Sequence, residues 1–217
     1  MNRIIICAGG PLEELPDLQA CSSEDTLFIG VDRGTVHLMD LGIIPSIAIG
    51  DFDSITATQL ELIKECVEEV SVFNSDKDET DTELAIIRAL ELEPEEIILT
   101  GVTGGRLDHF QSVLHLLYRL QFENAGVLFS IRNASNELAF FRSGVHRIYK
   151  VDELPYVSFF AFGGTVSGLT LTGFKYETVN AEIGMGMTKF TSNELIAEVC
   201  TISFRQGICL MVRSSDS

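Results

Sequence analysis

The sequence predicts an α/β protein in which an N-terminal, mostly parallel α/β domain precedes a C-terminal domain of antiparallel strands. Three observations predict this class: short continuous apolar runs, stretches with helical spacing between them, and a change to alternating residues after about residue 140. Continuous apolar runs are typical of strands covered on both faces, as in parallel sheets. We expect the first domain at residues 1–140 and the second at residues 141–217, joined near residues 133–142.

Strand and helix patterns alternate along the first domain. The apolar runs lie at residues 4–8, 26–29, 47–49, 97–100 and 127–131, and glycine follows each of the first four. Helical spacing recurs at residues 60–67 and 110–120. Thr80 and Glu83 fit a capping box at the start of a further helix, which Pro94 ends. This order of elements is typical of an α/β domain with right-handed crossovers.

The C-terminal part follows a different pattern. Alternation of apolar and polar residues at 166–172 and 195–204 predicts strands, and glycines recur between them. Short strands with frequent turns predict an antiparallel sandwich or barrel.

The charge balance excludes several classes of function. With 15 Lys and Arg against 32 Asp and Glu, the net charge is −17. Such a chain repels nucleic-acid phosphates and anionic membrane surfaces, so we expect neither as a partner. Acidic residues are compatible with chemistry on a phosphorylated ligand, because a divalent cation can bridge the two. No apolar run approaches the roughly 18 residues that a membrane span needs.

Cysteine usage indicates a reducing compartment. The five cysteines are odd in number and form no C-x-x-C pair, so we expect buried thiols rather than disulfides. The apolar run near the N-terminus is too short for the core of a signal peptide. We therefore expect a cytoplasmic protein.

A pair of aspartates follows the apolar run at 47–49. Asp51 and Asp53 lie on one side of the chain if extended geometry continues through Gly50–Ser54, because side chains alternate along a strand. Two neighbouring carboxylates favour either a shared proton or a divalent cation. Taken alone, this D-x-D motif is explained better by an exposed turn.

A second acidic cluster lies at the start of the helix that follows Thr80. The cluster, interrupted by Lys77, consists of Asp76, Asp78, Glu79, Asp81 and Glu83. Complementarity to the helix dipole explains Glu83 but not five acids together. Asp78 and Asp81 are spaced to face one ligand, and several aspartates suit Mg²⁺, which bridges to phosphate oxygens.

The third motif, residues 101–109, follows a predicted strand and begins a predicted helix. Its sequence is G-V-T-G-G-R-L-D-H. The glycines let backbone amides approach an anion, and Arg106 can bind phosphate oxygens through its planar guanidinium. His109 suits either a base or a residue held by backbone groups at the helix start.

A fourth strand end carries Asp32 and Arg33. Asp32 suits a metal or a ribose hydroxyl and Arg33 suits a phosphate, although both also fit a solvated turn. The chain contains neither G-x-x-x-x-G-K-[ST] nor G-x-G-x-x-G, which argues against a P-loop enzyme and a dinucleotide-binding protein. In an open α/β sheet, ligands bind where strands end, so these four strand ends form the candidate site.

Taken together, the motifs resemble the thiamin pyrophosphokinase family. G-D-F-D-S, D-K-D-E-T-D and T-G-G-R-L-D-H occur in the family's order and spacing, and the likeness extends to residues 173–176 and 192–194. The resemblance implies transfer of the pyrophosphoryl group of ATP to the hydroxyethyl oxygen of thiamine, giving thiamine diphosphate and AMP. It also implies a homodimer whose subunits combine a Rossmann-like α/β nucleotide domain with a thiamine-binding β-sandwich.

The resemblance further assigns roles to nucleotide-site residues. It implies that Asp51, Asp53 and Asp81 bind Mg²⁺ against the ATP phosphates, and that Asp78 and Arg106 complete the catalytic set. The remaining residues expected at the nucleotide are Asp32, Lys77, Thr103, Gly104, Gly105, Asp108 and His109.

The thiamine contacts follow from the same resemblance. Ser192 and Asn193 are expected to meet the thiamine pyrimidine from the second domain. Because the chain has no Trp, Phe204 or another aromatic residue is expected to cover the thiazolium ring.

Two alternative functions use the same residues. In a magnesium-dependent phosphohydrolase the aspartates orient water, and in a non-catalytic nucleotide- or metabolite-sensing module they only bind metal and ligand. Release of AMP that depends on thiamine distinguishes the transferase from both.

Overall fold

The computed structural model describes residues 2–73 and 79–216 of the chain. The chain forms two compact units, Met1–Ala134 and Ser135–Ser217. The division falls before the expected boundary at residue 140, because β7 (Asn136–Tyr149) pairs along its length with β12 (Val199–Ser214) of the second unit.

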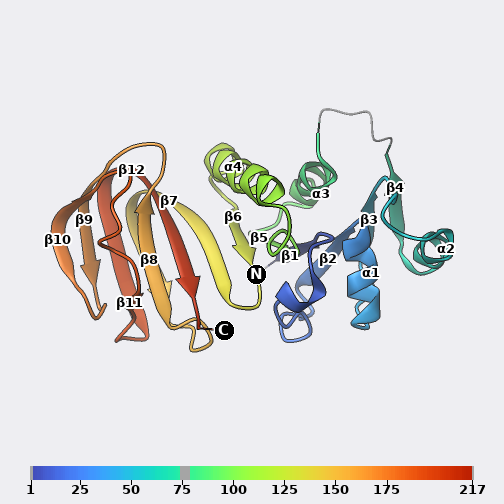
Figure 1. Ribbon diagram of the computed structural model, residues 1–217, viewed down its shortest axis with the longest axis horizontal. Helices are drawn as coiled ribbons and strands as arrows, with labels where there is room; N and C mark the ends of the chain where they lie inside the picture. Colours follow the sequence, from blue (N-terminus) through green and yellow to red (C-terminus); the bar gives the residue numbers. More distant parts are fainter. Residues whose placement is uncertain (1, 74–78, 217) are drawn as a thin grey trace. The chain divides into compact units, whose positions relative to one another are not determined.

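A parallel sheet forms the centre of the first unit, in the strand order β6-β5-β1-β2-β3-β4 (Figure 1). Each predicted apolar run forms one of its strands, and β4 at the edge was not predicted. The strands are β1 (Arg3–Cys7), β2 (Thr26–Val31), β3 (Ile47–Gly50), β4 (Glu69–Val72), β5 (Glu96–Thr100) and β6 (Leu128–Arg132). The inner strands are buried almost throughout, which explains why their sequences are continuous apolar runs.

Helices connect these strands and bury their apolar sides against the sheet. Leu38 of α1 packs in a core cluster with Ile5 and Phe28, and Ile63 of α2 packs with Ala48 in another. The helical elements are η1 (Leu12–Glu14), α1 (Arg33–Asp40), α2 (Ala57–Cys66), α3 (Asp81–Leu90) and α4 (Leu107–Glu123). The predicted helices correspond to α2, α3 and α4, whereas α1 was not predicted.

Threonine side chains begin two of these helices. Thr80 forms its half of the predicted capping box by accepting a hydrogen bond from the Glu83 backbone amide at 3.2 Å. The Glu83 carboxylate contacts Arg119 of α4 instead of completing the box. A reciprocal capping box, which the sequence reading missed, begins α2. There the Gln59 amide donates to Thr56 Oγ1 at 3.3 Å, and the Thr56 amide donates to Gln59 Oε1 at 2.9 Å.

Replacing Thr56 by alanine is expected to lower the free energy of unfolding by about 1 kcal/mol, because it removes one side of this capping box. Urea titration followed by circular dichroism measures the change. Thr58→Ala is the matched control, since Thr58 is exposed within α2 and alanine is the better helix former. Equal losses in the two variants would contradict the capping role.

The second unit consists of antiparallel strands. On one edge β12 pairs with β7. On its other edge, residues 201–206 pair with β9 and residues 209–214 pair with β8. The remaining strands are β8 (Tyr156–Ala161), β9 (Val166–Thr172), β10 (Thr178–Ile183) and β11 (Asn193–Glu194).

A bend in the paired strands β7 and β12 lets them contribute to two layers. The register shifts between Phe204 and Ile208, and Gly207 in this stretch has φ +98°. A Cβ there would lie 2.4 Å from the Thr165 carbonyl oxygen, so the bend requires glycine. Strands that change layers at such bends form the corners of sandwiches, and the apolar core of this unit lies between the layers. The predicted class, a parallel α/β domain followed by an antiparallel β-sandwich, is confirmed.

Some sequence expectations differ from the structure in detail. The strand expected at 195–204 begins only at Val199. Three cysteines are buried as expected, but Cys21 is partly exposed and Cys66 is exposed at the end of α2. Phe204 is 3% exposed within the core, so it does not offer a ring to a ligand. None of the helices in residues 2–73 and 79–216 combines the length and apolarity needed to cross a membrane.

Candidate functional site

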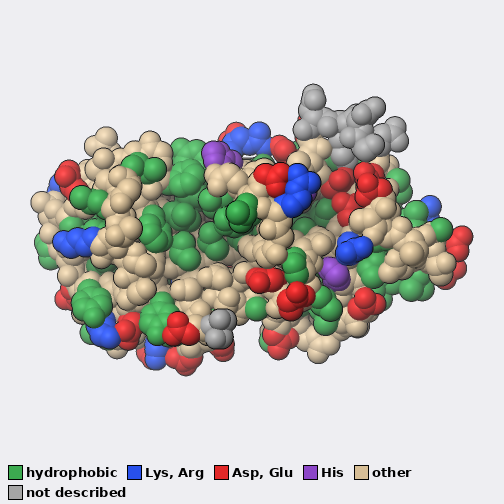
Figure 2. Space-filling model, viewed as in Figure 1, with side chains coloured by type: hydrophobic (Ala, Val, Ile, Leu, Met, Phe, Trp, Pro, Cys, Tyr) green, Lys and Arg blue, Asp and Glu red, His purple; other side chains and the backbone are tan. Residues whose placement is uncertain are grey.

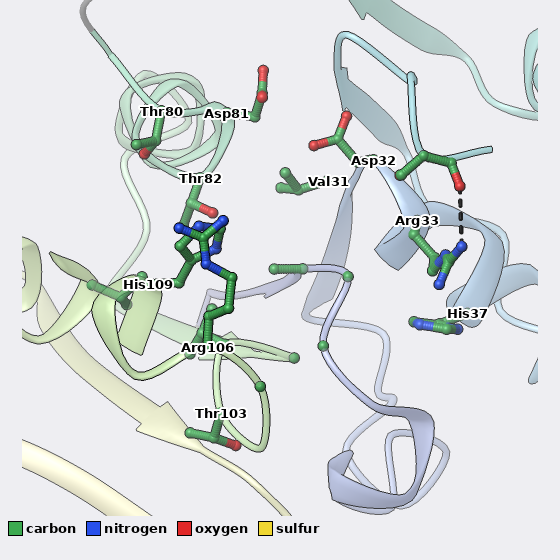
Figure 3. Close-up of a pocket in the computed structure, with 18 of the residues that line it drawn as sticks. Val31, Asp32, Arg33, His37, Thr80, Asp81, Thr82, Thr103, Arg106 and His109 are labelled. Carbon is green, nitrogen blue, oxygen red and sulfur yellow. Dashed lines mark hydrogen bonds between the residues drawn. The ribbon is translucent and has the colours of Figure 1, made fainter. Parts of the chain in front are cut away.

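A pocket of about 950 Å³ opens at the carboxyl ends of the parallel strands of the first unit (Figure 3). Its walls come from the segments that follow β1, β2, β3 and β5, together with the beginnings of α3 and α4. The strand order reverses between β1 and β5, and crevices at such switch points are the ligand sites of open α/β sheets. In the first unit, Figure 2 shows acidic side chains gathered with basic (Lys or Arg) and histidine side chains on one face.

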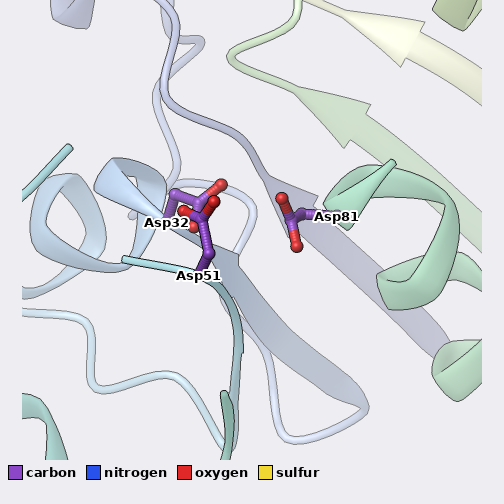
Figure 4. Close-up of side chains that lie close together, drawn as sticks. All are labelled: Asp32, Asp51 and Asp81. Atoms are coloured by element: carbon purple, nitrogen blue, oxygen red, sulfur yellow. The ribbon is translucent and has the colours of Figure 1, made fainter. Parts of the chain in front are cut away.

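Three carboxylates converge in this pocket. Asp32, Asp51 and Asp81 each offer an oxygen that lies within 4.8 Å of the other two, and all three side chains are half-buried. Asp32 precedes α1, Asp51 follows β3, and Asp81 is the first residue of α3 (Figure 4). Several carboxylate oxygens around one point suit a hard divalent cation, so these residues fit a metal site.

The backbone around Asp32 is specialised. Asp32 has φ +47°, and its Oδ1 accepts a hydrogen bond from the Phe52 amide at 3.1 Å. A Cβ on Gly50 would lie 1.8 Å from that oxygen, so only glycine at position 50 leaves room for the Asp32 carboxylate. The turn after β3 is therefore built to receive this side chain.

The same surroundings perturb the acidity of Asp32. Burial, the largest influence, raises the pKa of its carboxyl to about 6. The hydrogen bond from Phe52 opposes the shift, and the charges of Asp81, Asp51 and Asp53 add to it. Asp32 is therefore mostly ionised at neutral pH, but its charge is less stable there than that of a solvated carboxylate. A cation among the three carboxylates would relieve this cost.

Asp53 lies outside the three-carboxylate group. Its side chain is exposed and lines the pocket, while its amide donates to Asp51 Oδ1 at 3.1 Å. Phe52 between them has φ +57° and is buried. The chain is thus not extended here, so the condition under which Asp51 and Asp53 were expected to project to one side is not met, although both residues line the pocket.

The glycine motif forms the opposite wall. Gly101 and Gly104 have φ values of +67° and +79°, and Thr103, Gly105 and Arg106 line the pocket. A Cβ on Gly101 would lie 2.1 Å from a carbonyl oxygen of the segment after β1. Glycine therefore lets this loop approach the β1 end closely.

Arg106, Asp108 and His109 occupy the start of α4. Arg106 pairs with Asp108, with 2.5 Å between Nη2 and Oδ2, and this hydrogen bond lowers the pKa of the Asp108 carboxyl to about 2. Both partners are exposed, so the guanidinium can exchange this carboxylate for a ligand's phosphate at small cost. Arg106 and His109 both line the pocket (Figure 3).

Arg33 and His37 of α1 form a cationic and polar corner of the pocket. The Arg33 Nη2 donates to the Ser54 carbonyl oxygen at 3.2 Å (Figure 3). Burial, the largest influence, lowers the pKa of His37, although a hydrogen bond with the Gly10 backbone opposes the shift. Sequence reasoning missed His37 because it did not predict α1, on which His37 follows Arg33 by about one turn.

Comparisons with known proteins agree with this geometry. Residues 18–129 match the family "Thiamin pyrophosphokinase, catalytic domain", and residues 145–209 match "Thiamin pyrophosphokinase, vitamin B1 binding domain". Over 216 residues the chain is 44% identical to the thiamine pyrophosphokinase of Bacillus subtilis (strain 168), with 100% of each chain covered. The chain belongs to the thiamin pyrophosphokinase family.

Solved structures of thiamin pyrophosphokinases share the fold along the whole chain. The crystal structure of the Bacillus subtilis protein has a TM-score of 0.91 and 43% identity, and the match covers 99% of this chain and 100% of that one. A thiamin pyrophosphokinase from Geobacillus thermodenitrificans has a TM-score of 0.89 and 40% identity, covering 99% and 98% of the two chains. The family resemblance inferred from the motifs is confirmed.

The residues expected to meet thiamine lie in the segment that matches the family's vitamin B1 binding domain. Asn193 is buried, and its side chain accepts from the Tyr176 amide and donates to the Tyr176 carbonyl, both at 2.9 Å. Ser192 is exposed with φ +56°, and its amide donates to Ser158 Oγ at 3.0 Å. The Asn193 amide thus fixes the turn at Tyr176. Lys77 and Asp78, also expected in the thiamin pyrophosphokinase site, lie outside the described residues.

Proposed function

We propose that this chain transfers the pyrophosphoryl group of ATP to thiamine, giving thiamine diphosphate and AMP. The observation that carries the proposal is the convergence of Asp32, Asp51 and Asp81 in a pocket at the strand ends. Full-length similarity to a thiamine pyrophosphokinase supports the choice of this reaction over others that use metal and nucleotide.

The metal in this proposal is Mg²⁺. Asp51 and Asp81 hold it together with Asp32, and Asp53 lies beside them on the pocket wall. When bound, Mg²⁺ would supply positive charge that neutralises part of the charge of the phosphates. The acidic wall needs such a partner, because carboxylates alone repel a triphosphate.

The opposite wall binds the rest of the nucleotide. Backbone amides of the loop at residues 103–105 approach the phosphates, and Arg106 leaves Asp108 to supply positive charge. His109 lines the same wall, and Lys77 is assigned to the phosphates from the segment before α3. Pyrophosphoryl transfer requires mainly in-line positioning and countercharge, and this pocket supplies both. We assign acceptance of the proton from the thiamine hydroxyl to an aspartate of the second acidic cluster.

The second unit binds thiamine in this proposal. Ser192 contributes directly to the pyrimidine contacts, and Asn193 holds the adjoining turn at Tyr176. We further propose a homodimer, and a cytoplasmic location in keeping with five cysteines that are all free thiols.

Incubation with ATP and thiamine, with and without Mg²⁺, tests the reaction when products are identified by mass. The proposal requires AMP and thiamine diphosphate in equal amounts, and no turnover after the metal is chelated. Orthophosphate release that ignores thiamine would instead identify a phosphohydrolase. Binding of ATP and Mg²⁺ with no product of any kind would identify a sensing module.

A further inference from the structure

Asn133 joins two segments that are far apart in the sequence. It follows β6 and is 7% exposed. Its Nδ2 donates to Glu14 Oε2 at 2.9 Å and to Thr103 Oγ1 at 3.0 Å. A carboxylate only accepts hydrogen bonds, so the NH₂ group of Asn133 must face Glu14, and both of its hydrogens are used.

Glu14 also packs against the glycine-containing loop at residues 101–105. Its carbonyl oxygen accepts from the Ala134 amide at 2.9 Å. Gly104, with φ +79°, packs over its side chain so closely that a Cβ would lie 2.5 Å from Glu14 Cγ. The loop is tied a second time where the Gly10 amide donates to the Gly101 carbonyl at 2.7 Å.

We propose that Asn133 and Glu14 form a brace that positions the loop at residues 101–105 for nucleotide binding. The inference rests on the proposed function in one respect, that the ligand of this loop is ATP. Because Asn133 donates to the Thr103 oxygen, the Thr103 hydroxyl keeps its own hydrogen for an acceptor on the nucleotide. A loop that is already held in place loses less conformational entropy when the ligand binds.

Asn133 and Glu14 are therefore positioning residues, which act through Thr103 and Gly104. Their loss should weaken nucleotide binding and leave the chemical step nearly intact. We expect Asn133→Ala to raise KM for ATP about tenfold, the effect of one buried hydrogen-bonded contact, with kcat and KM for thiamine changed less than about threefold. Calorimetry with Mg²⁺ and α,β-methylene-ATP, whose α–β bridge resists cleavage, should show the same loss of affinity.

A matched control separates positioning from general stability. Asn124→Ala removes a similar hydrogen bond of a side-chain amide, which Asn124 Nδ2 donates to the Leu120 carbonyl oxygen at 3.1 Å at the end of α4. It should lower Tm without changing the affinity for the ATP analogue. Equal weakening of nucleotide binding in Asn124→Ala and Asn133→Ala would overturn the brace.

A double-mutant cycle tests the pairing itself. Glu14→Gln keeps an acceptor for Asn133 and should bind the analogue nearly as wild type does, whereas Glu14→Ala should weaken binding. The losses in Glu14→Ala and Asn133→Ala should be strongly non-additive, and full additivity would contradict the proposal. If wild type forms no thiamine diphosphate but the binding losses persist, the proposed reaction fails and the brace stands.

Discussion

Replacing Asp51 or Asp81 by asparagine is expected to lower kcat by about a thousandfold and to leave the fold intact. Each side chain contributes an oxygen to the three-carboxylate group, and an amide oxygen is a weaker, uncharged ligand for a divalent cation. The Mg²⁺ concentration for half-maximal activity should also rise by about ten- to a hundredfold. Steady-state turnover over a Mg²⁺ titration measures both effects, and circular dichroism verifies the fold.

Two further aspartates give this experiment its controls. Asp17→Asn makes the same change of charge at an exposed site. The Asp17 side chain accepts a hydrogen bond from the Ala20 backbone N–H, and the side-chain oxygen of asparagine can accept the same bond. The substitution should leave turnover unchanged. Two sets of metal ligands have been considered: Asp51, Asp53 and Asp81 from the sequence, and Asp32, Asp51 and Asp81 from the structure. Asp53→Asn distinguishes them, because Asp53 belongs only to the first set. We expect a smaller loss for Asp53→Asn, and full turnover of Asp51→Asn at ordinary Mg²⁺ concentrations would contradict the metal role.

The sequence predicted those elements whose burial is complete enough to leave a periodic pattern. The inner strands are apolar on both faces, and α4 keeps its apolar residues at helical spacing over 17 residues. The edge strand β4 is partly exposed and reads E-V-S-V, which resembles a loop. Helix α1 has only 8 residues and contains Gly34 in its first turn, so neither length nor propensity reveals it.

Gly34 has a structural reason that a single sequence does not show. A Cβ at this position would lie 2.0 Å from the Cys7 carbonyl oxygen, so glycine is needed where α1 crosses the end of β1. The close approach is a contact between segments separated by about one strand and one loop, and only the folded structure reveals it. A poor helix former is therefore kept inside a helix.

The sequence predicted which strand ends form the candidate site, but not which side chains converge there. That Asp51 and Asp81 converge follows from placing both at the carboxyl edge of one sheet. Asp32 belongs to the three-carboxylate group and Asp53 does not, because the backbone has positive φ at Asp32 and Phe52. L-residues rarely adopt positive φ, and the sequence does not show where it occurs. The Asn133–Glu14 contact joins residues 119 positions apart, beyond the reach of any local pattern.

Asp32 offers the second large effect, in which stability and activity change in opposite directions. Asp32→Asn keeps an oxygen that can accept from the Phe52 amide but removes the carboxylate charge. Burial and neighbouring acids raise the pKa of Asp32 from 3.8 to about 6, so ionisation of this group opposes folding. In metal-free protein at pH 8, we therefore expect Asp32→Asn to be more stable than wild type by about 1–2 kcal/mol, allowing for partial exposure of the carboxyl to solvent.

The pH dependence of this gain follows from the two states of the wild-type chain. Well below pH 3.8 the carboxyl is protonated in both the folded and the unfolded chain, so wild type and Asp32→Asn should differ little in stability. Between pH 4 and 6 the unfolded chain ionises first, wild-type stability falls as pH rises, and the advantage of Asp32→Asn should grow to its full size above about pH 6. Urea titrations in a chelator at several pH values measure the difference.

Metal should reverse the sign of the effect. A cation bound by the three carboxylates removes the repulsion that the Asp32→Asn substitution otherwise relieves, so saturating Mg²⁺ should stabilise wild type more than the variant. Turnover of the variant should fall by about a hundredfold or more, because the site loses one charged ligand. A variant that is less stable than wild type in chelator at pH 8 would show that the Asp32 charge supports the fold, and a variant with normal turnover would remove Asp32 from the metal site.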